Sequence, residues 1–384
     1  MTFSPLGVLK TMINTIVVLK ETHPLEKRVA LDPKNTARFV KAGFKVIVAP
    51  DAGAAAYFSN EAYEQAGAIV EPLVFDEKAI IVSINAPDPK IIHKFKAGSI
   101  AISLLDPYNN LPIVESLAKN QITSIALEFI PRITRAQSMD VLSSQATISG
   151  YQSVLIAADL SPRFFPMLTT AAGTIRPAKA LIIGAGVAGL QAIATARRLG
   201  AQVEAYDIRP DAKEQVESLG AKLVDTGVNA AGEGGYAREL TEEETAQQAA
   251  ALAKHVKDSH ILITTAAIPG KRAPIIITKE MIESMMPGAV IVDMAAETGG
   301  NCEGTVAGET LKINDVTLCG PLNLPSTVAI HASEMFSQNI YNYLSPFITE
   351  TGLTLDHEDD VVKNSLITYD SEIVSDRIKA LIEA

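Results

Sequence analysis

Short apolar runs alternate with amphipathic segments along most of the chain. In the first third the apolar runs have the length of strands, and they are Thr15–Leu19, Phe44–Ala49, Ala79–Ile84, Ser99–Leu105 and Ile122–Ile130. The segments between them carry apolar residues at helical spacing, and include Pro33–Ala42, Asn60–Ala66, Lys90–Lys96 and Leu111–Asn120. This alternation predicts a mostly parallel sheet with helices on both faces.

The alternation breaks near residue 131. Pro131 ends a strand, and the segment RITRAQSMD follows it, with charged and amide side chains among small residues. A long helix-compatible segment, Val141–Leu160, comes next, so we interpret this region as a crossover between domains. A second series begins at Lys179, with strands predicted at Ala180–Ile183, Gln202–Tyr206, Lys222–Val224, Ile261–Thr264, Ala289–Val292 and Val316–Cys319. Six such strands are typical of a doubly wound dinucleotide-binding domain.

We therefore predict an α/β protein of two domains, each a mostly parallel sheet flanked by helices. The first domain is expected at residues 1–142, and the second, a Rossmann domain, at residues 143–344. Residues 345–384 are expected to return to the first domain. Their apolar residues form one stripe at helical spacing that must pack on something, and these are Ile373, Val374, Ile378, Leu381 and Ile382.

Composition excludes several classes of protein. Of the residues, 47% are hydrophobic, which excludes a disordered chain. The length of 384 residues exceeds what a single hydrophobic core usually supports, so two domains are expected. Its formal net charge of −11 would repel a phosphate backbone, so we expect no nucleic-acid partner. Cys302 and Cys319 have neither disulfide nor zinc spacing, so we expect a reducing compartment and no metal.

The most membrane-like stretch is residues 178–196. It contains Lys179, Gln191 and three glycines, so a strand, a glycine turn and a helix explain it better than a membrane span. The N-terminus lacks the basic region of a signal peptide. We expect a soluble, intracellular chain that does not insert into a membrane.

The glycine turn matches the dinucleotide fingerprint G-x-G-x-x-G at Gly184, Gly186 and Gly189. The first glycine permits the tight turn, the second lets a pyrophosphate approach the backbone, and the third lets the helix pack on the sheet. The next strand ends at Asp207, where a carboxylate accepts ribose hydroxyls and repels a 2′-phosphate. NAD(H) is therefore expected over NADP(H), although Arg209 could serve a 2′-phosphate.

Two features leave alternatives open. The glycine-rich segment Asp225–Tyr236 is either a flexible linker or a lid that closes on nucleotide through Tyr236. The six histidines do not cluster, and none has the setting of a catalytic acid, although a dehydrogenase of carbonyl or amine substrates needs a general acid or base.

Several motifs together resemble one known family. RAQSMDVLSSQ, TTAAGT, GAGVAGLQAIATARRLGA, KEQVESLG, GGYARE and IPGKRAP look like the NAD(H)-binding component, domain I, of proton-translocating nicotinamide nucleotide transhydrogenase. The resemblance runs from about residue 20 to residue 347. That family shares its fold with alanine dehydrogenase, which is therefore the rival interpretation.

The resemblance implies a site around the nicotinamide of NAD(H). It places Arg132, Gln137 and Asp140 there as catalytic residues, with Ser143 beside them. Asp140 and Ser143 can hydrogen-bond the carboxamide, and Gln137 can bridge to the partner's nucleotide. The loop could also be a salt-bridged domain hinge. The resemblance supports the interpretation of Tyr236 as part of a lid, and the expected cofactor contacts also include Val187, Ile208, Thr265 and Ala266.

The rival is tested by specific positions. Alanine dehydrogenases carry a lysine in the strand corresponding to Ile80–Pro87 and a histidine after the strand corresponding to Ser99–Leu105, and this sequence has neither. The missing lysine also departs from many transhydrogenases. Glu297 stands near the place of an aspartate of alanine dehydrogenases. Arg28 matches a substrate-contacting arginine of those enzymes but recurs in transhydrogenases.

The expected function follows from the resemblance. The chain would bind NADH and pass hydride directly to NADP⁺ held by a partner β subunit, which requires no protein acid or base at the reacting carbon. Membrane-embedded subunits would couple transfer to proton translocation and hold the chain at the cytoplasmic face of the membrane. A homodimer is expected. The alternatives are an alanine dehydrogenase-type enzyme and a non-catalytic NAD(H) sensor.

Overall fold

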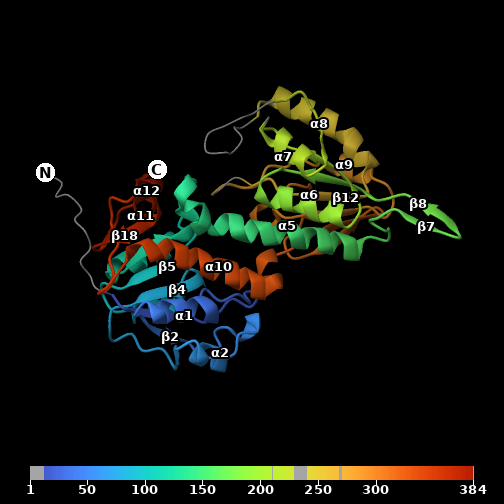
Figure 1. Cartoon of the computed structure of the whole chain (residues 1–384). Coiled ribbons are helices and arrows are strands. Elements are labelled where there is room, and N and C mark those ends of the chain that lie inside the picture. The colour runs from blue at the N-terminus through green and yellow to red at the C-terminus, as the bar shows by residue number, and fades with distance from the viewer. Residues whose placement is uncertain (1–12, 210, 229–239, 268–269, 384) are drawn as a thin grey trace. The chain divides into compact units, whose positions relative to one another are not determined.

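The computed structural model describes residues 13–209, 211–228, 240–267 and 270–383 (Figure 1). The chain forms two compact units: one holds the described residues up to Gln145 and from Ser326 onward, and the other holds Ala146–Pro325. We call them unit 1 and unit 2. The fold class predicted from the sequence, two α/β domains with mostly parallel sheets, is confirmed.

Unit 1 contains an eight-stranded sheet in the order β19-β18-β6-β5-β4-β1-β2-β3. Its strands are β1 (Thr15–Val18), β2 (Lys45–Val48), β3 (Ile69–Val70), β4 (Ile80–Asn85), β5 (Ile100–Leu104), β6 (Thr123–Ala126), β18 (Leu366–Tyr369) and β19 (Glu372–Ile373). The first six pair in parallel, and β18 and β19 extend the sheet antiparallel. Buried side chains of its strands belong to two apolar clusters.

The helices of unit 1 are α1 (Pro33–Lys41), α2 (Asn60–Gln65), α3 (Pro89–Ile92), α4 (Leu111–Lys119), α10 (Ala329–Leu344), α11 (Asp360–Ser365) and α12 (Asp376–Glu383). Helix α1 begins where its sequence directs: Asp32 accepts from the N–H of Asn35 at 3.0 Å, and Pro33 occupies the first turn. The same carboxylate accepts from the Ser337 hydroxyl of α10 at 2.7 Å, so the cap also joins two helices.

The structure divides the chain at different points from those expected. The boundaries lie at 145/146, within α5 (Val141–Leu160), and at 325/326, whereas the sequence placed them at 142/143 and 344/345. Helix α10 therefore belongs to unit 1, where Phe336 and Ile340 join the cluster that contains Ile16. No local pattern in the sequence indicates which sheet this helix covers.

The C-terminal stripe is not one helix face, so that prediction was wrong. Ile373 lies in β19, after a turn in which Asp370 and Ser371 have φ of 49° and 69°. In α12 only Ile378 is buried, and Leu381 and Ile382 are 40% and 48% exposed. Pairing with β18 takes the first part of the stripe into the sheet, because its backbone groups are satisfied there.

Unit 2 has a seven-stranded sheet in the order β11-β10-β9-β12-β13-β15-β14. Its strands are β9 (Lys179–Ile183), β10 (Gln202–Tyr206), β11 (Lys222–Leu223), β12 (Ile261–Thr264), β13 (Val290–Asp293), β14 (Thr310–Ile313) and β15 (Val316–Cys319). The six predicted strands are present and parallel, and their order is that of a Rossmann sheet. The antiparallel edge strand β14 was not predicted.

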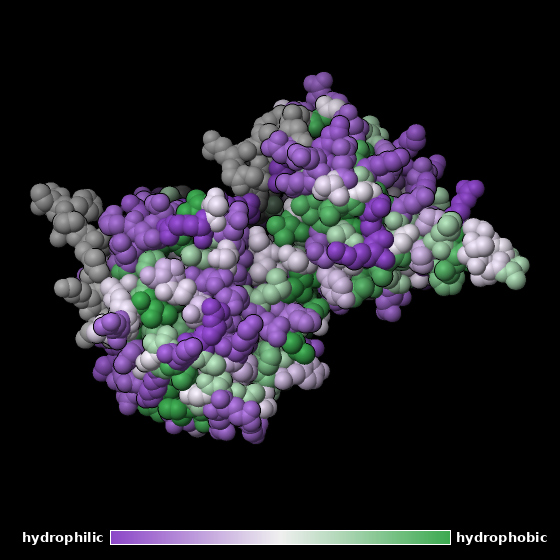
Figure 2. All heavy atoms as spheres, in the orientation of Figure 1, coloured by the Kyte–Doolittle hydropathy of each residue, from purple (hydrophilic) through white to green (hydrophobic). Residues whose placement is uncertain are grey.

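The other helices of unit 2 are α6 (Val187–Arg198), α7 (Ala212–Ser218), α8 (Glu242–Asp258) and α9 (Lys279–Glu283). Helix α8 begins with a capping box between Thr241 and Glu244, and hydrophilic side chains cover its outer side (Figure 2). Each unit also has a small antiparallel hairpin. In unit 2, β7 (Leu168–Thr170) pairs with β8 (Gly173–Ile175), and in unit 1, β16 (Ile348–Thr349) pairs with β17 (Gly352–Leu353). Among the described helices, none combines the length and apolarity needed to cross a bilayer.

Candidate nucleotide site

The glycine turn of unit 2 joins β9 to α6. Gly184 has φ of 93°, and a Cβ there would lie 2.5 Å from the Thr265 Oγ1 atom. A Cβ at Gly189 would lie 1.8 Å from the carbonyl oxygen of Gly184. Both positions therefore require glycine for packing within the protein alone.

Gly186 is different. It is the N-cap residue of α6, its φ of −75° suits any residue, and a Cβ there would meet nothing within 4 Å. Neither backbone strain nor packing explains a glycine at this position. A ligand that must approach the backbone at the N-terminus of α6 does explain it, and the first N–H groups of a helix attract an anion. Val187, which opens the helix, is 42% exposed beside it.

Helix α5 supports this turn through a contact that the sequence did not reveal. A Cβ at Gly150 would lie 2.1 Å from the carbonyl oxygen of Ala188 in the first turn of α6. The two helices therefore touch backbone to backbone. Gly150 looks like an ordinary helical glycine in the sequence, and its neighbour Ala188 is far away along the chain.

Asp207, directly after β10, turns its carboxylate back to the glycine turn. Its Oδ2 atom accepts from the N–H of Ala185 at 2.7 Å, and Arg209 donates to both oxygens. Burial raises the pKa of this carboxyl, but the hydrogen bonds from Arg209 and Ala185 outweigh burial and hold the pKa below its usual range. The group is therefore an anion at neutral pH. Ile208 next to it packs against the apolar cluster below the sheet.

The segment after β12 forms the other side of the turn. The Thr265 hydroxyl reaches the carbonyl oxygens of Ile183 and Gly184 at 3.1 and 3.2 Å. The side chain of Asn301 accepts from the N–H of Ala266 at 3.0 Å and donates to its carbonyl at 2.9 Å. The predicted residues Thr265 and Ala266 are thus held in place beside Gly184.

A buried carboxylate that sequence reasoning missed organises this region. Asp293, at the end of β13, is 0% exposed. It accepts five hydrogen bonds of 2.6–3.1 Å, from the hydroxyls of Thr264 and Thr305 and from the N–H groups of Ala295, Asn301 and Cys302. It therefore shapes the loop that carries Asn301. The only signal in the sequence was a carboxylate at the end of an apolar strand.

The other predicted residues lie in unit 1. Asp140 caps α5: its two oxygens accept from the N–H of Ser143 at 2.9 Å and from the Ser143 hydroxyl at 2.6 Å. Gln137 lies in the short 3-10 helix Thr134–Met139, and its side chain and that of Arg132 are exposed.

Helix α10 holds this 3-10 segment. The side-chain amides of Asn339 and Asn342 both donate to the carbonyl oxygen of Ser138, at 2.9 and 2.8 Å. The structure thus brings Asp140 and Ser143 into contact and presents Gln137 on a fixed backbone. Tyr236 lies outside the described residues.

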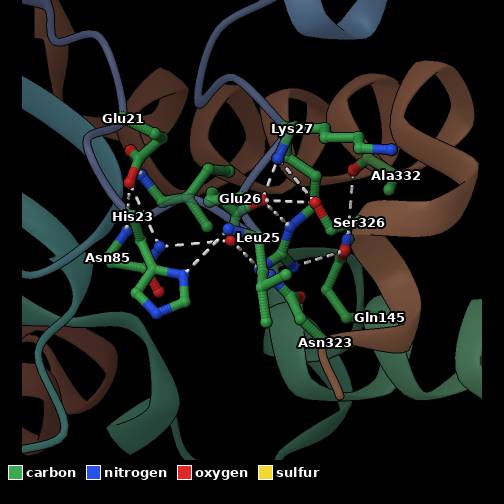
Figure 3. A network of polar contacts seen from close by, with 12 residues as sticks. Glu21, His23, Leu25, Glu26, Lys27, Asn85, Gln145, Asn323, Ser326 and Ala332 are labelled. Carbon is green, nitrogen blue, oxygen red and sulfur yellow. Dashed lines mark hydrogen bonds and ion pairs between the residues drawn. The ribbon is translucent and has the colours of Figure 1, made fainter. Parts of the chain in front are cut away.

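A second polar cluster lies near the carboxyl ends of β1 and β4 (Figure 3). Arg28 and Glu26 form a buried bidentate pair, at 2.8 and 2.7 Å, with side chains 6% and 1% exposed. The remaining Nη1 atom of Arg28 donates to Gln145 at 2.9 Å. Asn85 donates to Glu26 at 3.1 Å and also to Glu21. The charge of Arg28 is therefore neutralised by Glu26.

Glu21 in this cluster carries a strongly shifted pKa. Burial raises the pKa to about 7, hydrogen bonds from Ile84 and Asn85 oppose the shift, and the charge of Glu26 adds to it. Between pH 4.5 and about 7 the folded chain thus holds a proton that the unfolded chain releases. The contribution of Glu21 to the free energy of unfolding therefore falls as the pH rises through this range. Above this range Glu21 is ionised in the folded chain as well, and the loss of stability is complete.

The variant Glu21→Gln removes this titration. We expect its stability relative to the wild type to increase from about pH 5 to about pH 8. Urea denaturation at several pH values measures this difference, with Glu115→Gln, an exposed carboxylate of α4, as the control. A difference that is constant with pH would contradict the raised pKa.

Three of the histidines contact other parts of the fold in different ways. His255 pairs with Glu204 at 2.8 Å, and His260 accepts from the N–H of Lys179 at 2.9 Å. His357 is 3% exposed and its ring lies 4.4 Å from that of Tyr369. Within the described part of the chain, no group of three or more histidine, cysteine or carboxylate side chains could hold a metal ion.

Family models match both halves of the chain. The model described as "Alanine dehydrogenase/PNT, N-terminal domain" matches residues 17–149, and the corresponding C-terminal model matches residues 153–376. The chain belongs to the alanine dehydrogenase/PNT family. The resemblance inferred from the motifs is thereby confirmed.

Within the alanine dehydrogenase/PNT family, the chain is more similar to transhydrogenases than to alanine dehydrogenases. It is 42% identical over 373 residues to an NAD(P) transhydrogenase alpha-subunit protein of Rhodospirillum rubrum, covering 94% of this chain and 97% of that protein. It is 28% identical over 293 residues to alanine dehydrogenase of Bacillus subtilis, covering 75% and 72%.

Among solved structures, a transhydrogenase is likewise more similar to this chain than an alanine dehydrogenase is. The crystal structure of transhydrogenase from Sinorhizobium meliloti matches with a TM-score of 0.86 and 42% identity, over 94% of this chain and all of that one. An L-alanine dehydrogenase matches with a TM-score of 0.78 and 25% identity, over 96% and 99%.

Proposed function

We propose that this chain is the NAD(H)-binding alpha subunit of a proton-translocating transhydrogenase. In this proposal hydride leaves C4 of the dihydronicotinamide of NADH and arrives at C4 of the nicotinamide of NADP⁺ on a partner β subunit. NADH is oxidised, NADP⁺ is reduced, and no protein group exchanges a proton at either carbon. The observation that supports it best is the glycine turn of unit 2, where nothing in the protein explains Gly186, combined with the lack of the lysine and histidine of alanine dehydrogenases at the corresponding positions of unit 1.

The missing chemistry is specific. Asn85 ends the strand in which alanine dehydrogenases carry a lysine, and Asp106 follows the strand after which they carry a histidine. Arg28, which corresponds to their substrate-contacting arginine, is bound in a bidentate pair by Glu26. A carboxylate substrate would have to compete with that pair, and no histidine follows β5 to exchange a proton with it.

The described residues would divide the work as follows. The N–H groups at Gly186 and Val187 would bind the pyrophosphate, and Asp207 would accept the adenosine ribose hydroxyls. Ile208, Thr265 and Ala266 would line the nucleotide, with Gly184 and Gly189 shaping the turn.

At the nicotinamide end, Arg132 would orient the ring and phosphates, and Asp140 and Ser143 would hydrogen-bond the carboxamide. Gln137 would bridge to the partner's nucleotide, and Tyr236 would close over the site. Bringing two rings within about 3–3.5 Å and excluding water is the contribution required of the protein. We also propose a homodimer held at the cytoplasmic face of the membrane by membrane-embedded partner subunits.

Nucleotide binding tests this proposal directly. The chain has no tryptophan, so NADH fluorescence can be titrated with little interference from the protein. NADH is expected to bind more tightly than NADPH, because Asp207 is anionic and repels a 2′-phosphate. Addition of pyruvate and ammonium is expected to leave NADH unoxidised. Rapid oxidation would instead identify an amino-acid dehydrogenase.

The transfer arm of the same test uses membranes that contain the NADP(H)-binding partner. Gln137→Asn is expected to slow hydride transfer while NADH affinity stays nearly unchanged, since the shorter amide still fits the exposed position but no longer reaches the partner. Gln65→Asn, at an exposed position of α2, is the control. Equal loss of transfer and NADH affinity would contradict the bridging role and indicate a cofactor-binding role instead.

A further inference from the structure

The Asp207 carboxylate is saturated with hydrogen bonds. Oδ1 accepts from the backbone N–H of Arg209 at 2.9 Å and from its Nε at 2.8 Å. Oδ2 accepts from the N–H of Ala185 at 2.7 Å and from Nη2 of Arg209 at 2.7 Å. An ionised carboxylate offers about four acceptor positions, so all of them are in use. A ribose cannot add its hydroxyls to this carboxylate as it stands.

Two of the four donors come from one edge of the Arg209 guanidinium. Nε and Nη2 point side by side at the two carboxylate oxygens, one donor to each. The 2′- and 3′-hydroxyls of a ribose present two neighbouring donors in the same way. The guanidinium therefore occupies the two acceptor positions that a vicinal diol requires.

We propose that Arg209 is a specificity-determining residue that occupies the ribose position on Asp207 in the unliganded chain and is displaced by the vicinal diol of NAD(H). This inference rests on the proposed NAD(H) function. It adds a competition within the protein: each ribose that binds Asp207 must first release the guanidinium.

The geometry permits such an exchange. The Arg209 side chain is 28% exposed, so the released guanidinium can reach water, whereas the Asp207 side chain is only 6% exposed. The N–H groups of Ala185 and Arg209 still hold the carboxylate when the guanidinium leaves. The two hydroxyl donors of the diol replace the two hydrogen bonds that the guanidinium makes to Asp207, and water hydrates the released guanidinium.

Displacement also affects the choice between nucleotides. Once released, the guanidinium remains close to the ribose 2′-position, because the residue is only two positions from Asp207. There it attracts a 2′-phosphate, which Asp207 repels. Arg209 therefore weakens the binding of NAD(H) and strengthens the binding of NADP(H). The difference between the two affinities is smaller than Asp207 alone would produce.

The variant Arg209→Met tests the proposal, because methionine keeps an apolar stem and donates no hydrogen bond. The affinity for NADH is expected to increase by about three- to tenfold, the range of one net hydrogen bond, while the affinity for NADPH decreases. Arg198→Met removes the same charge at an exposed position at the far end of α6, and is expected to change neither affinity. Fluorescence titration measures both.

A second titration tests the diol itself. In competition with NADH, 5′-AMP is expected to bind Arg209→Met more tightly than the wild type, whereas 2′-deoxy-5′-AMP, which has a single ribose hydroxyl, is expected to gain less. Weaker or unchanged NADH binding by Arg209→Met would overturn the inference and leave the proposed function intact. Failure of the wild-type chain to bind NADH would overturn both.

Discussion

Replacing Gly186 by alanine is expected to abolish tight NADH binding while leaving the chain as stable as the wild type. The new methyl group meets no protein atom within 4 Å, and the backbone conformation suits alanine. It would stand where the pyrophosphate must approach the helix N-terminus. NADH affinity is expected to fall by at least a factor of about 100, since two hydrogen bonds to charged phosphate oxygens are each worth about 1.5–3 kcal/mol and each 1.4 kcal/mol changes affinity about tenfold.

The matched variant Gly189→Ala separates binding from packing. Its methyl group would lie 1.8 Å from the carbonyl oxygen of Gly184, so the helix must move from the turn. We expect a loss of several kcal/mol in the free energy of unfolding, of the order found for strained or overpacked sites. Thermal denaturation and NADH titration together distinguish the two variants. A Gly186→Ala chain that binds NADH normally would remove the main structural support for the nucleotide site.

Replacing Arg28 by methionine is expected to have the largest effect on stability in unit 1. It would leave the Glu26 carboxylate buried, with its side chain 1% exposed and without the guanidinium that neutralises it. Removing one partner of a buried ion pair costs about 3–5 kcal/mol of unfolding free energy. The hydroxyl of Ser326 and the amide of Asn85 would still donate to Glu26, but neither carries a charge.

Urea denaturation measures this effect, with two comparison variants. Lys45→Met breaks an ion pair whose side chains are 47% and 50% exposed, and is expected to change stability by no more than about 0.5 kcal/mol. The double variant Glu26→Gln, Arg28→Met removes the uncompensated charge and is expected to recover part of the loss. If Arg28→Met and Lys45→Met had equal effects, the buried pair would not stabilise unit 1.

Local patterns predicted the parts of the fold that depend on near neighbours in the sequence. The alternation of apolar runs and helical segments identified the parallel strands of both sheets except the two-residue strand β3, because burial on both faces requires an apolar strand whatever the strand order. The strands β3, β14, β18 and β19 were not predicted, since they are short and all but β3 pair antiparallel. Strands β3, β14 and β19 also lie at sheet edges and are partly exposed. Their assignment depends on pairing with strands that were already in place.

In the candidate site, too, some residues could be predicted from local spacing and others could not. Gly184, Gly186 and Gly189 could be predicted because the turn, the helix N-terminus and the following carboxylate recur at fixed spacing. The contact of Gly150 with Ala188 and the five hydrogen bonds of Asp293 join residues from separate elements. No spacing in the sequence indicates them, since the distance along the chain between such partners follows from the whole topology.

The sequence by itself determined the fold class and the glycine turn, because both rest on short-range pattern and on residue types that physical chemistry restricts. It also indicated the family, because several of its motifs resemble those of known members. Only the tertiary structure decided that α10 packs in unit 1, that Glu26 neutralises Arg28, and that Arg209 fills the acceptor positions of Asp207. The physical reason is that a charged or apolar side chain specifies the kind of partner it needs, and the folded chain decides which partner comes within reach.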